Sequence, residues 1–277
     1  MIIIKENINI KDFHLYNCNK NIQSSSIQHL ISNTIKNPKK VIKINNFLLD
    51  NQNDSNLIIL LGKLNHLGIG ISIDEQKAFE FYQKAADLGN SYGIYNLADC
   101  YCNGIGTSVD KQKAFELFQK AADLGNSSGI NQLGYCYQHG IGTSIDKQKA
   151  FELFQKAADL GNSYGIYNLG YCYSHGIGTS IDKQKAFELF QKVADLRNSY
   201  GMYNLGYCYS HGIGTRYCYS HGIGTSIDKQ KAFELFQKAA DLGISIAQYN
   251  LASMYENGNG IKQDNNQAIY WYKKSAE

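Results

Sequence analysis

Residues 143–178 read TSIDKQKAFELFQKAADLGNSYGIYNLGYCYSHGIG, and residues 179–214 read TSIDKQKAFELFQKVADLRNSYGMYNLGYCYSHGIG. A shift of 36 residues superimposes the two segments with three changes. The Ala-Phe pair of this unit recurs in the same register, beginning at Ala78, Ala114, Ala150 and Ala186. The chain is therefore a repeat array, and its structure has to be inferred from the repeating unit.

Each unit is predicted to fold as a hairpin of two helices. The apolar residues of 150–160 recur at three- and four-residue intervals, which places them on one face of the second helix of a hairpin. Asp146 precedes this helix as an N-cap. Gly161 follows it as a left-handed residue that ends the helix, a position that Arg197 takes in the next copy. The first helix of the next hairpin is predicted from Tyr164 to about residue 175.

A hairpin of two such short helices cannot bury its own apolar stripe, but stacked copies bury each other's. We therefore predict an all-α fold, an αα-hairpin superhelix of the right-handed solenoid type, over residues 55–277. About six units of 36 residues fill this range, and no strand pattern interrupts it. Residues 1–54 do not match the repeat and are predicted to be either a helical cap or a partly disordered leader.

One insertion interrupts the register of the array. Residues 207–215 recur at once as residues 217–225, so the next Ala-Phe pair, at Ala232, arrives ten residues late. We predict that this insertion near residues 207–226 extends the loop between two paired helices and leaves the later copies in register. Loops accept such insertions at a modest entropic cost.

The repeating unit resembles a known family. The LGYCY segment at residues 169–173, the turn from Gly176 to Gly178, and the segment 186–194 are similar to the Sel-one-like repeat, which is related to the tetratricopeptide repeat. The resemblance covers about residues 57–277. It implies an αα superhelix that usually serves as a protein-interaction scaffold. A cysteine-rich secreted branch of the family has been linked to penicillin binding.

The bulk composition narrows the class of partner. The 277 residues carry a formal net charge of +3, which is too small for a nucleic-acid footprint, and no apolar run approaches the roughly 18 residues of a membrane span. The first residues hold no apolar stretch long enough for a secretory signal, and the seven Cys are an odd number. We therefore predict a cytoplasmic protein that binds neither nucleic acid nor a membrane; its oligomeric state stays open.

Cys-x-x-His pairs are the first candidate for a chemical site, because residues three apart share a helical face. They begin at Cys136, Cys172, Cys208 and Cys218. In the outer copies Leu64 and Met254 take the Cys position, and neither replaces a thiolate as a zinc ligand. The sequence therefore predicts packing thiols, with no metal and no cofactor.

Ser-x-x-Lys motifs are the second candidate, since a Lys can help to activate a Ser in hydrolases of the β-lactamase type. They begin at Ser108, Ser144, Ser180 and Ser226. The accompanying Ser-Asp-Asn and Lys-Thr-Gly motifs are absent from the chain. We predict that the protein is not an enzyme. The alternative is a serine hydrolase with penicillin-binding activity, as the resemblance to the secreted branch implies.

The third candidate is a face of Tyr and Asn residues on the first helices, turned away from the apolar stripe. First helices commonly line the concave surface of helical solenoids, and Tyr suits interfaces because it joins apolar area to a hydroxyl. We predict that a protein or peptide partner binds there, through Tyr95, Asn96, Asp99, Asn131, Gln132, Tyr135, Tyr167, Asn168, Tyr171, Tyr203, Asn204 and Tyr207.

This face predicts a non-enzymatic scaffold or adaptor. The central copies are nearly identical in their surface residues as well as in their core residues. A groove adapted to one irregular peptide would differ from copy to copy. A recently expanded structural array without a dedicated ligand is therefore a further alternative.

Overall fold

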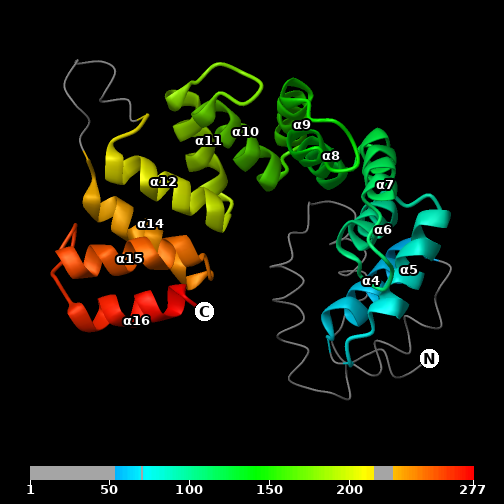
Figure 1. Ribbon diagram of the computed structural model, residues 1–277, viewed down its shortest axis with the longest axis horizontal. Coiled ribbons are helices and arrows are strands. Elements are labelled where there is room, and N and C mark those ends of the chain that lie inside the picture. The colour runs from blue at the N-terminus through cyan, green and yellow to red at the C-terminus, as the bar shows by residue number, and fades with distance from the viewer. Residues whose placement is uncertain (1–53, 70, 215–226) are drawn as a thin grey trace, which may run out of the picture. The chain divides into compact units, whose positions relative to one another are not determined.

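The computed structural model describes residues 54–69, 71–214 and 227–277 (Figure 1). The predictions for residues 1–53 and for residues 215–226 of the insertion lie outside these ranges. The described residues form twelve α-helices and no strand. The helices are α4 (Ser55–Leu67), α5 (Glu75–Asp87), α6 (Ser91–Asn103), α7 (Lys111–Asp123), α8 (Ser127–His139), α9 (Lys147–Asp159), α10 (Ser163–His175), α11 (Lys183–Asp195), α12 (Ser199–His211), α14 (Lys229–Asp241), α15 (Ser245–Asn257) and α16 (Asn265–Ser275).

The chain divides into two compact units. The first comprises Met1–Cys136 with Ile141–Ser144, and the second comprises Tyr137–Gly140 with Ile145–Glu277. Among the described helices, α4 to α7 and most of α8 belong to the first unit, and α9 to α16 belong to the second. Among the described helices, the first unit therefore contains two complete hairpins and the second contains three.

Consecutive helices pack as hairpins inside each unit. In the first unit α4 pairs with α5 and α6 with α7, and in the second α10 pairs with α11, α12 with α14 and α15 with α16. Successive hairpins stack through a second helix on the next first helix, as α5 on α6, α11 on α12 and α14 on α15. The predicted all-α hairpin solenoid is confirmed, because consecutive helices pair and successive hairpins stack within each unit.

Capping side chains explain where the helices begin. Asp146 Oδ1 accepts a backbone N–H at 2.9 Å, and α9 starts at the next residue, earlier than its apolar periodicity indicates. Asn162 Oδ1 accepts the N–H of Gly165 at 2.9 Å, and α10 starts at Ser163. The predicted Asp N-cap is confirmed. Because Asn162 is the N-cap of α10, this helix starts at Ser163, one residue before the predicted Tyr164.

Left-handed residues follow the second helices. Gly161 has a φ of 76°, as predicted, and glycine adopts this conformation without steric strain. Arg197 stands at the same position after α11 and keeps the left-handed conformation, at a φ of 60°. Among the described residues it is the one non-glycine with a positive φ. Its side chain therefore carries a conformational cost of roughly 1–2 kcal/mol.

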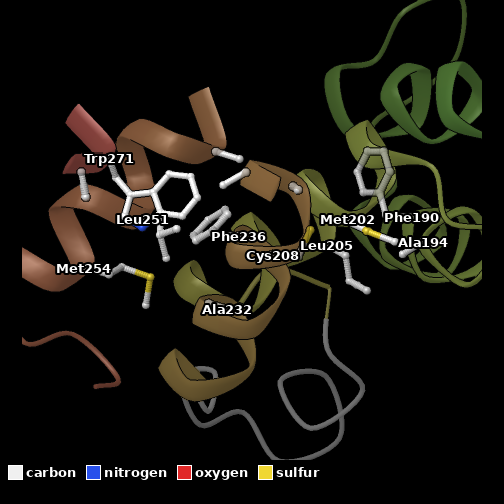
Figure 2. Close-up of a cluster of buried hydrophobic side chains, with 14 of the residues drawn as sticks. Phe190, Ala194, Met202, Leu205, Cys208, Ala232, Phe236, Leu251, Met254 and Trp271 are labelled. Carbon is white, nitrogen blue, oxygen red and sulfur yellow. The ribbon is translucent and has the colours of Figure 1, made fainter. Parts of the chain in front are cut away.

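The core of the second unit is a layer of apolar side chains between its hairpins (Figure 2). Phe190 of α11, Phe236 of α14 and Trp271 of α16 belong to this layer and are buried. Leu251 of α15 is fully buried near Phe236 and Trp271 (Figure 2). Burying an aromatic side chain of this size contributes about 2 kcal/mol, so the hairpins stabilise one another.

Glycine allows the closest approach between stacked hairpins of the second unit. A Cβ on Gly165 of α10 would lie 2.6 Å from the Cβ of Ala157 in α9. A Cβ on Gly201 of α12 would lie 2.4 Å from Cγ1 of Val193 in α11. Carbon atoms do not approach so closely, so alanine at either position would push the helices apart. Glycine lowers the helix propensity here, but the packing requires it.

Candidate partner-binding face

The residues predicted to bind a partner lie on four first helices. α6 carries Tyr95, Asn96 and Asp99; α8 carries Asn131, Gln132 and Tyr135; α10 carries Tyr167, Asn168 and Tyr171; α12 carries Tyr203, Asn204 and Tyr207. The residues on α6 and α8 belong to the first unit, and those on α10 and α12 belong to the second. The prediction therefore concerns two faces, one in each unit.

One Tyr on each of α6, α10 and α12 packs inward more than the sequence indicates. The ring of Tyr167 is half-buried, and its centroid lies 6.2 Å from that of Phe190 in α11. The same contact recurs as Tyr203–Phe236 at 5.8 Å and Tyr95–Phe118 at 5.8 Å. These Tyr rings therefore help to hold the two helices of a hairpin together.

Asn side chains connect neighbouring first helices of the second unit. A hydrogen bond joins the hydroxyl of Tyr167 to the side chain of Asn204, and another joins Tyr203 to Asn250. Burial raises the pKa of Tyr167, and the hydrogen bond to Asn204 opposes part of this effect. Tyr200 lies beside Tyr167, with ring centroids 5.6 Å apart. These side chains link adjacent copies of the repeat.

Tyr171 and Tyr207 each contact a His; Tyr207 is exposed, whereas Tyr171 is half-buried. Each stacks on a His one turn later, with ring centroids 4.1 Å apart, Tyr171 on His175 and Tyr207 on His211. The His Nδ1 atoms lie 3.1 and 3.0 Å from the carbonyl oxygens of their Tyr partners. Both His side chains are exposed. One aromatic pair of fixed orientation is thus available in each of these two copies.

The predicted set lacks three residues that the structure adds to this face, His175, His211 and Asn250. Subtraction of the ten-residue insertion puts Asn250 at the position of Asn204, so the repeat alone contains the signal for it. For the two His residues, the signal is a spacing of four residues from a Tyr on the same helix, which brings side chains together on one face.

The face in the first unit is more polar. Asn131 of α8 is buried, whereas Tyr135 is exposed. Asp99 of α6 is half-buried, and its Oδ1 accepts a hydrogen bond from Asn103 at 2.7 Å. Burial raises the pKa of Asp99. The remaining amide residues of the predicted set are half-buried, namely Asn96, Gln132, Asn168 and Asn204.

The Cys-x-x-His pairs are divided between the core and the surface. Cys172 is fully buried, and burial raises the pKa of its thiol to about 12. The thiol is therefore protonated at neutral pH, whereas zinc binds the thiolate. His175 is exposed and stacks on Tyr171. Within the ranges that the structure describes, no three His, Cys, Asp or Glu side chains gather as a metal site requires.

The Lys of two Ser-x-x-Lys motifs caps the end of a first helix. Lys183 Nζ donates a hydrogen bond to Ser174 O at 2.6 Å, and Lys111 Nζ donates to Cys102 O. These carbonyl groups belong to the last turns of α10 and α6, where a cation meets the negative end of the helix dipole. The motif has a structural use in these copies that involves no catalytic step.

Comparison with family models finds a match described as the Sel1 repeat, at residues 58–90, 91–126, 127–162, 163–198, 199–244 and 245–277. The chain belongs to the Sel1 repeat family. The resemblance inferred from the repeated motifs is confirmed. No curated protein matches this Sel1 repeat chain.

Solved structures of Sel1 repeat proteins share the fold. A Sel1 repeat protein from Oxalobacter formigenes is 28% identical with a TM-score of 0.70, over 82% of this chain and 89% of that chain. A protective antigen of uropathogenic Escherichia coli, described as having an SLR fold, is 28% identical with a TM-score of 0.65. The match covers 84% of this chain and 48% of the antigen, so the chain spans about half the antigen's length.

A more distant structure supports the fold alone. An immunity protein from Pseudomonas aeruginosa is 22% identical with a TM-score of 0.50, over 73% of this chain and 73% of that chain. The helical hairpin architecture thus persists where sequence identity is low.

Proposed function

We propose that this Sel1 repeat protein is a non-enzymatic scaffold or adaptor that binds a protein partner along its first helices. Sel1 repeat solenoids generally serve as protein-interaction scaffolds. First helices line the concave surface in helical solenoids of this kind, where extended partners bind. In this proposal, some of the predicted residues contact the partner, and the others hold these contact residues in place.

The observation that carries the proposal is the pair of stacked aromatic groups, Tyr171 on His175 and Tyr207 on His211. Tyr207 is 40% exposed although it is a large aromatic side chain. Tyr is enriched at interface hot spots because it supplies a rigid apolar ring and a hydroxyl. Tyr167 and its hydrogen-bond partners support these groups from the adjacent positions, so we assign binding to the stacked pairs.

The sequences of α10 and α12 contain no Asp, Glu, Lys or Arg. Recognition on this face therefore depends on apolar contact and neutral hydrogen bonds rather than on charge. Salt screens charged contacts but has little effect on contacts of this kind. We expect a partner of this face to stay bound when the salt concentration is raised.

We also propose a cytoplasmic location. Five of the described cysteines are free and buried, namely Cys100, Cys102, Cys136, Cys172 and Cys208. Proteins of oxidising compartments commonly use their cysteines in disulfides, whereas reducing compartments keep thiols free. The free thiols therefore fit a reducing compartment.

Affinity capture from the source cells tests the binding face. The full chain and the variant Tyr171→Ala/Tyr207→Ala serve as baits, and captured proteins are identified by mass spectrometry. We expect a partner of the full chain to be lost from the variant and to be retained by the full chain in high salt. Circular dichroism checks that the variant keeps its helix content.

A matched control removes aromatic and apolar area elsewhere. Ile269 and Tyr270 of α16 are exposed, and neither lies on a first helix. The variant Ile269→Ala/Tyr270→Ala should keep the partner. If both variants capture the same proteins as the unchanged chain, the stacked aromatic pairs do not form the binding site.

A further inference from the structure

The two stacked pairs, Tyr171 on His175 and Tyr207 on His211, occupy the last turns of α10 and α12. Both helices have 13 residues, and none of the described helices is long and apolar enough to cross a membrane. A shift of 36 residues carries one pair onto the other, so the pairs take the same position in their copies of the repeat.

Each pair is held in place by its own helix. The hydroxyl of Ser174 lies 2.5 Å from Nδ1 of His175 and donates a hydrogen bond to the carbonyl of Tyr171 at 2.9 Å. The equivalent contacts recur around Ser210, at 2.6 and 2.9 Å. A ring that is already ordered loses little conformational freedom when it contacts a partner.

The hydroxyl groups of Tyr171 and Tyr207 differ from that of Tyr167, one turn earlier, which is bonded to Asn204. Among the residues that the structure describes, none forms a hydrogen bond with either of these two hydroxyls. Each stacked pair therefore combines apolar ring area with a hydroxyl that can donate to a partner.

The spacing of the pairs follows from the contact between their helices. The ring of Tyr167 in α10 lies 5.6 Å from that of Tyr200 in α12, so the two helices are neighbours. Helices whose side chains touch run about 8–10 Å apart. Because the pairs are equivalent, about the same distance separates Tyr171 from Tyr207. A segment that contacts both rings has to present similar groups at this interval.

Polyproline II is the regular backbone conformation that meets this requirement. It has about three residues per turn and rises about 3.1 Å per residue, so every third side chain returns to one face after about 9.3 Å. Residues on one face of a β-strand repeat at about 6.6 or 13 Å. An α-helix repeats at about 5.4 or 10.8 Å, but its backbone carbonyls are paired internally. The carbonyls of polyproline II have no internal partner and can accept from the Tyr hydroxyls.

The charge of the face favours the same kind of segment. α10 and α12 contain no Asp, Glu, Lys or Arg. Lys183 reaches the end of α10 from α11, and its ammonium donates to the Ser174 carbonyl at 2.6 Å. An uncharged segment is therefore the electrostatic complement of the stacked pairs. Proline adds an apolar ring and stiffens the polyproline II conformation, which reduces the entropy lost on binding.

We propose that the stacked pairs of α10 and α12 bind a proline-rich segment of the partner in the polyproline II conformation. Two prolines in a Pro-x-x-Pro arrangement each pack on one ring, the first on Tyr171 and the second on Tyr207, in either chain direction. The Tyr hydroxyls donate to backbone carbonyls of the segment. The inference rests on the proposed function, because it names the chemistry of the partner that this face binds.

Fluorescence anisotropy of a labelled peptide with the full chain tests the proposal. The peptide contains Pro-Ala-Ala-Pro-Ala-Ala-Pro between Gly residues. We expect saturable binding that high salt changes by less than about twofold, because no ion pair contributes. A peptide of the same composition with its prolines two residues apart should bind at least about tenfold less tightly, because only one proline then reaches a ring.

Variants of the two Tyr residues test the contacts one by one. Tyr171→Ala and Tyr207→Ala should each weaken binding at least about tenfold. Tyr207→Phe keeps the ring but removes the hydroxyl, so it should weaken binding by about threefold to tenfold. The matched control Ile269→Ala/Tyr270→Ala should bind as the unchanged chain does. Circular dichroism checks each fold, and if an Ala variant loses helix content, Tyr207→Phe and the two peptides decide the result.

Three results overturn the proposal: no binding of the first peptide, equal binding of the two peptides, and an equal loss in the Tyr variants and the control. A cellular partner that depends on Tyr171 and Tyr207 but is not displaced by excess Pro-Ala-Ala-Pro peptide also overturns it, and leaves the proposed function standing. If no captured protein depends on these Tyr residues, the proposed function fails, and this inference fails with it.

Discussion

Arg197 and Gly161 occupy equivalent positions in consecutive copies, and both have a left-handed backbone. The side chain of Arg197 makes this conformation costly, whereas glycine adopts it freely. The two copies otherwise differ at two positions in this 36-residue unit. The effect of backbone strain at Arg197 can therefore be measured against the unstrained Gly161 of the same molecule.

We expect Arg197→Gly to raise the free energy of unfolding by about 1 kcal/mol, because it removes the left-handed strain. Urea unfolding followed by circular dichroism measures the change. Gly161→Arg is the matched control and should lower the free energy of unfolding by a similar amount. A neutral or destabilising Arg197→Gly would show that contacts of the Arg side chain offset its backbone strain.

At the scale of the helices, two effects compete at the first-helix glycines. Alanine favours the helix over glycine by up to about 1 kcal/mol. An added methyl group at Gly165 meets the Cβ of Ala157 at 2.6 Å, and overpacking of this kind costs about 1–3 kcal/mol. The contact between α9 and α10 therefore decides whether alanine at position 165 raises or lowers the free energy of unfolding.

Gly165→Ala is expected to lower the free energy of unfolding by about 1 kcal/mol, since the packing loss exceeds the gain in helix propensity. Thermal and urea unfolding measure the effect. The double variant Gly165→Ala/Ala157→Gly removes the Cβ contact but leaves backbone atoms of residues 157 and 158 at 2.9 Å from the added methyl group, so it should recover only part of the loss. Stabilisation by the single variant would contradict the close approach of the two helices.

At the scale of the whole molecule, a buried thiol recurs in consecutive first helices. Burial raises the pKa of Cys100, Cys136 and Cys172 to about 12 and that of Cys208 to about 11. The folded chain therefore keeps thiol protons that the unfolded chain releases near the ordinary Cys pKa of 9.0. The stabilisation is complete below about pH 9 and is lost as the pH rises toward the folded values.

We expect the free energy of unfolding to fall between about pH 9 and pH 11, by roughly 1 kcal/mol per pH unit for each buried thiol. Tyr167 and Tyr203, whose pKa values are also raised by burial, act in the same direction at higher pH. Urea unfolding across this range measures the slope. The variant Cys172→Ala/Cys208→Ala should show a shallower slope, and a stability independent of pH would contradict the burial of the thiols.

The insertion provides a second test on this scale. α12 and α14 pair in the same way as α10 and α11, although ten more residues separate them. Deletion of residues 215–224 would join Gly214 to Thr225 and restore the 36-residue register. We expect the free energy of unfolding to change by less than about 1 kcal/mol, because loop closure depends weakly on length.

Thermal unfolding of the deletion variant and of the full chain measures this difference. Only a deletion within the loop tests the insertion, because this change leaves the helices of the array unaltered. A loss of several kcal/mol or of helix content would show that the insertion packs against the array.

The boundary between residues 54 and 55 and the loop assignment of the insertion both stay predictions.

The sequence by itself determined the hairpin unit, its period and its caps, because these depend on local chemistry. The apolar spacing along 150–160, the Asp146 N-cap and the left-handed Gly161 need no distant residue for their interpretation. Identical copies then imply stacking, since one hairpin cannot cover its own apolar side. The sequence also placed the candidate face on the first helices, and its role in binding stays a prediction.

Tertiary structure alone decided what each residue of that face contacts. Tyr167 and Tyr171 differ by one helical turn, yet the first packs on Phe190 and bonds Asn204, whereas the second stacks on an exposed His. The neighbouring helices α11 and α12 supply Phe190 and Asn204 beside Tyr167, and this packing sets the difference. Helical periodicity gives the direction of a side chain, but only the packed neighbour determines whether it meets protein or solvent.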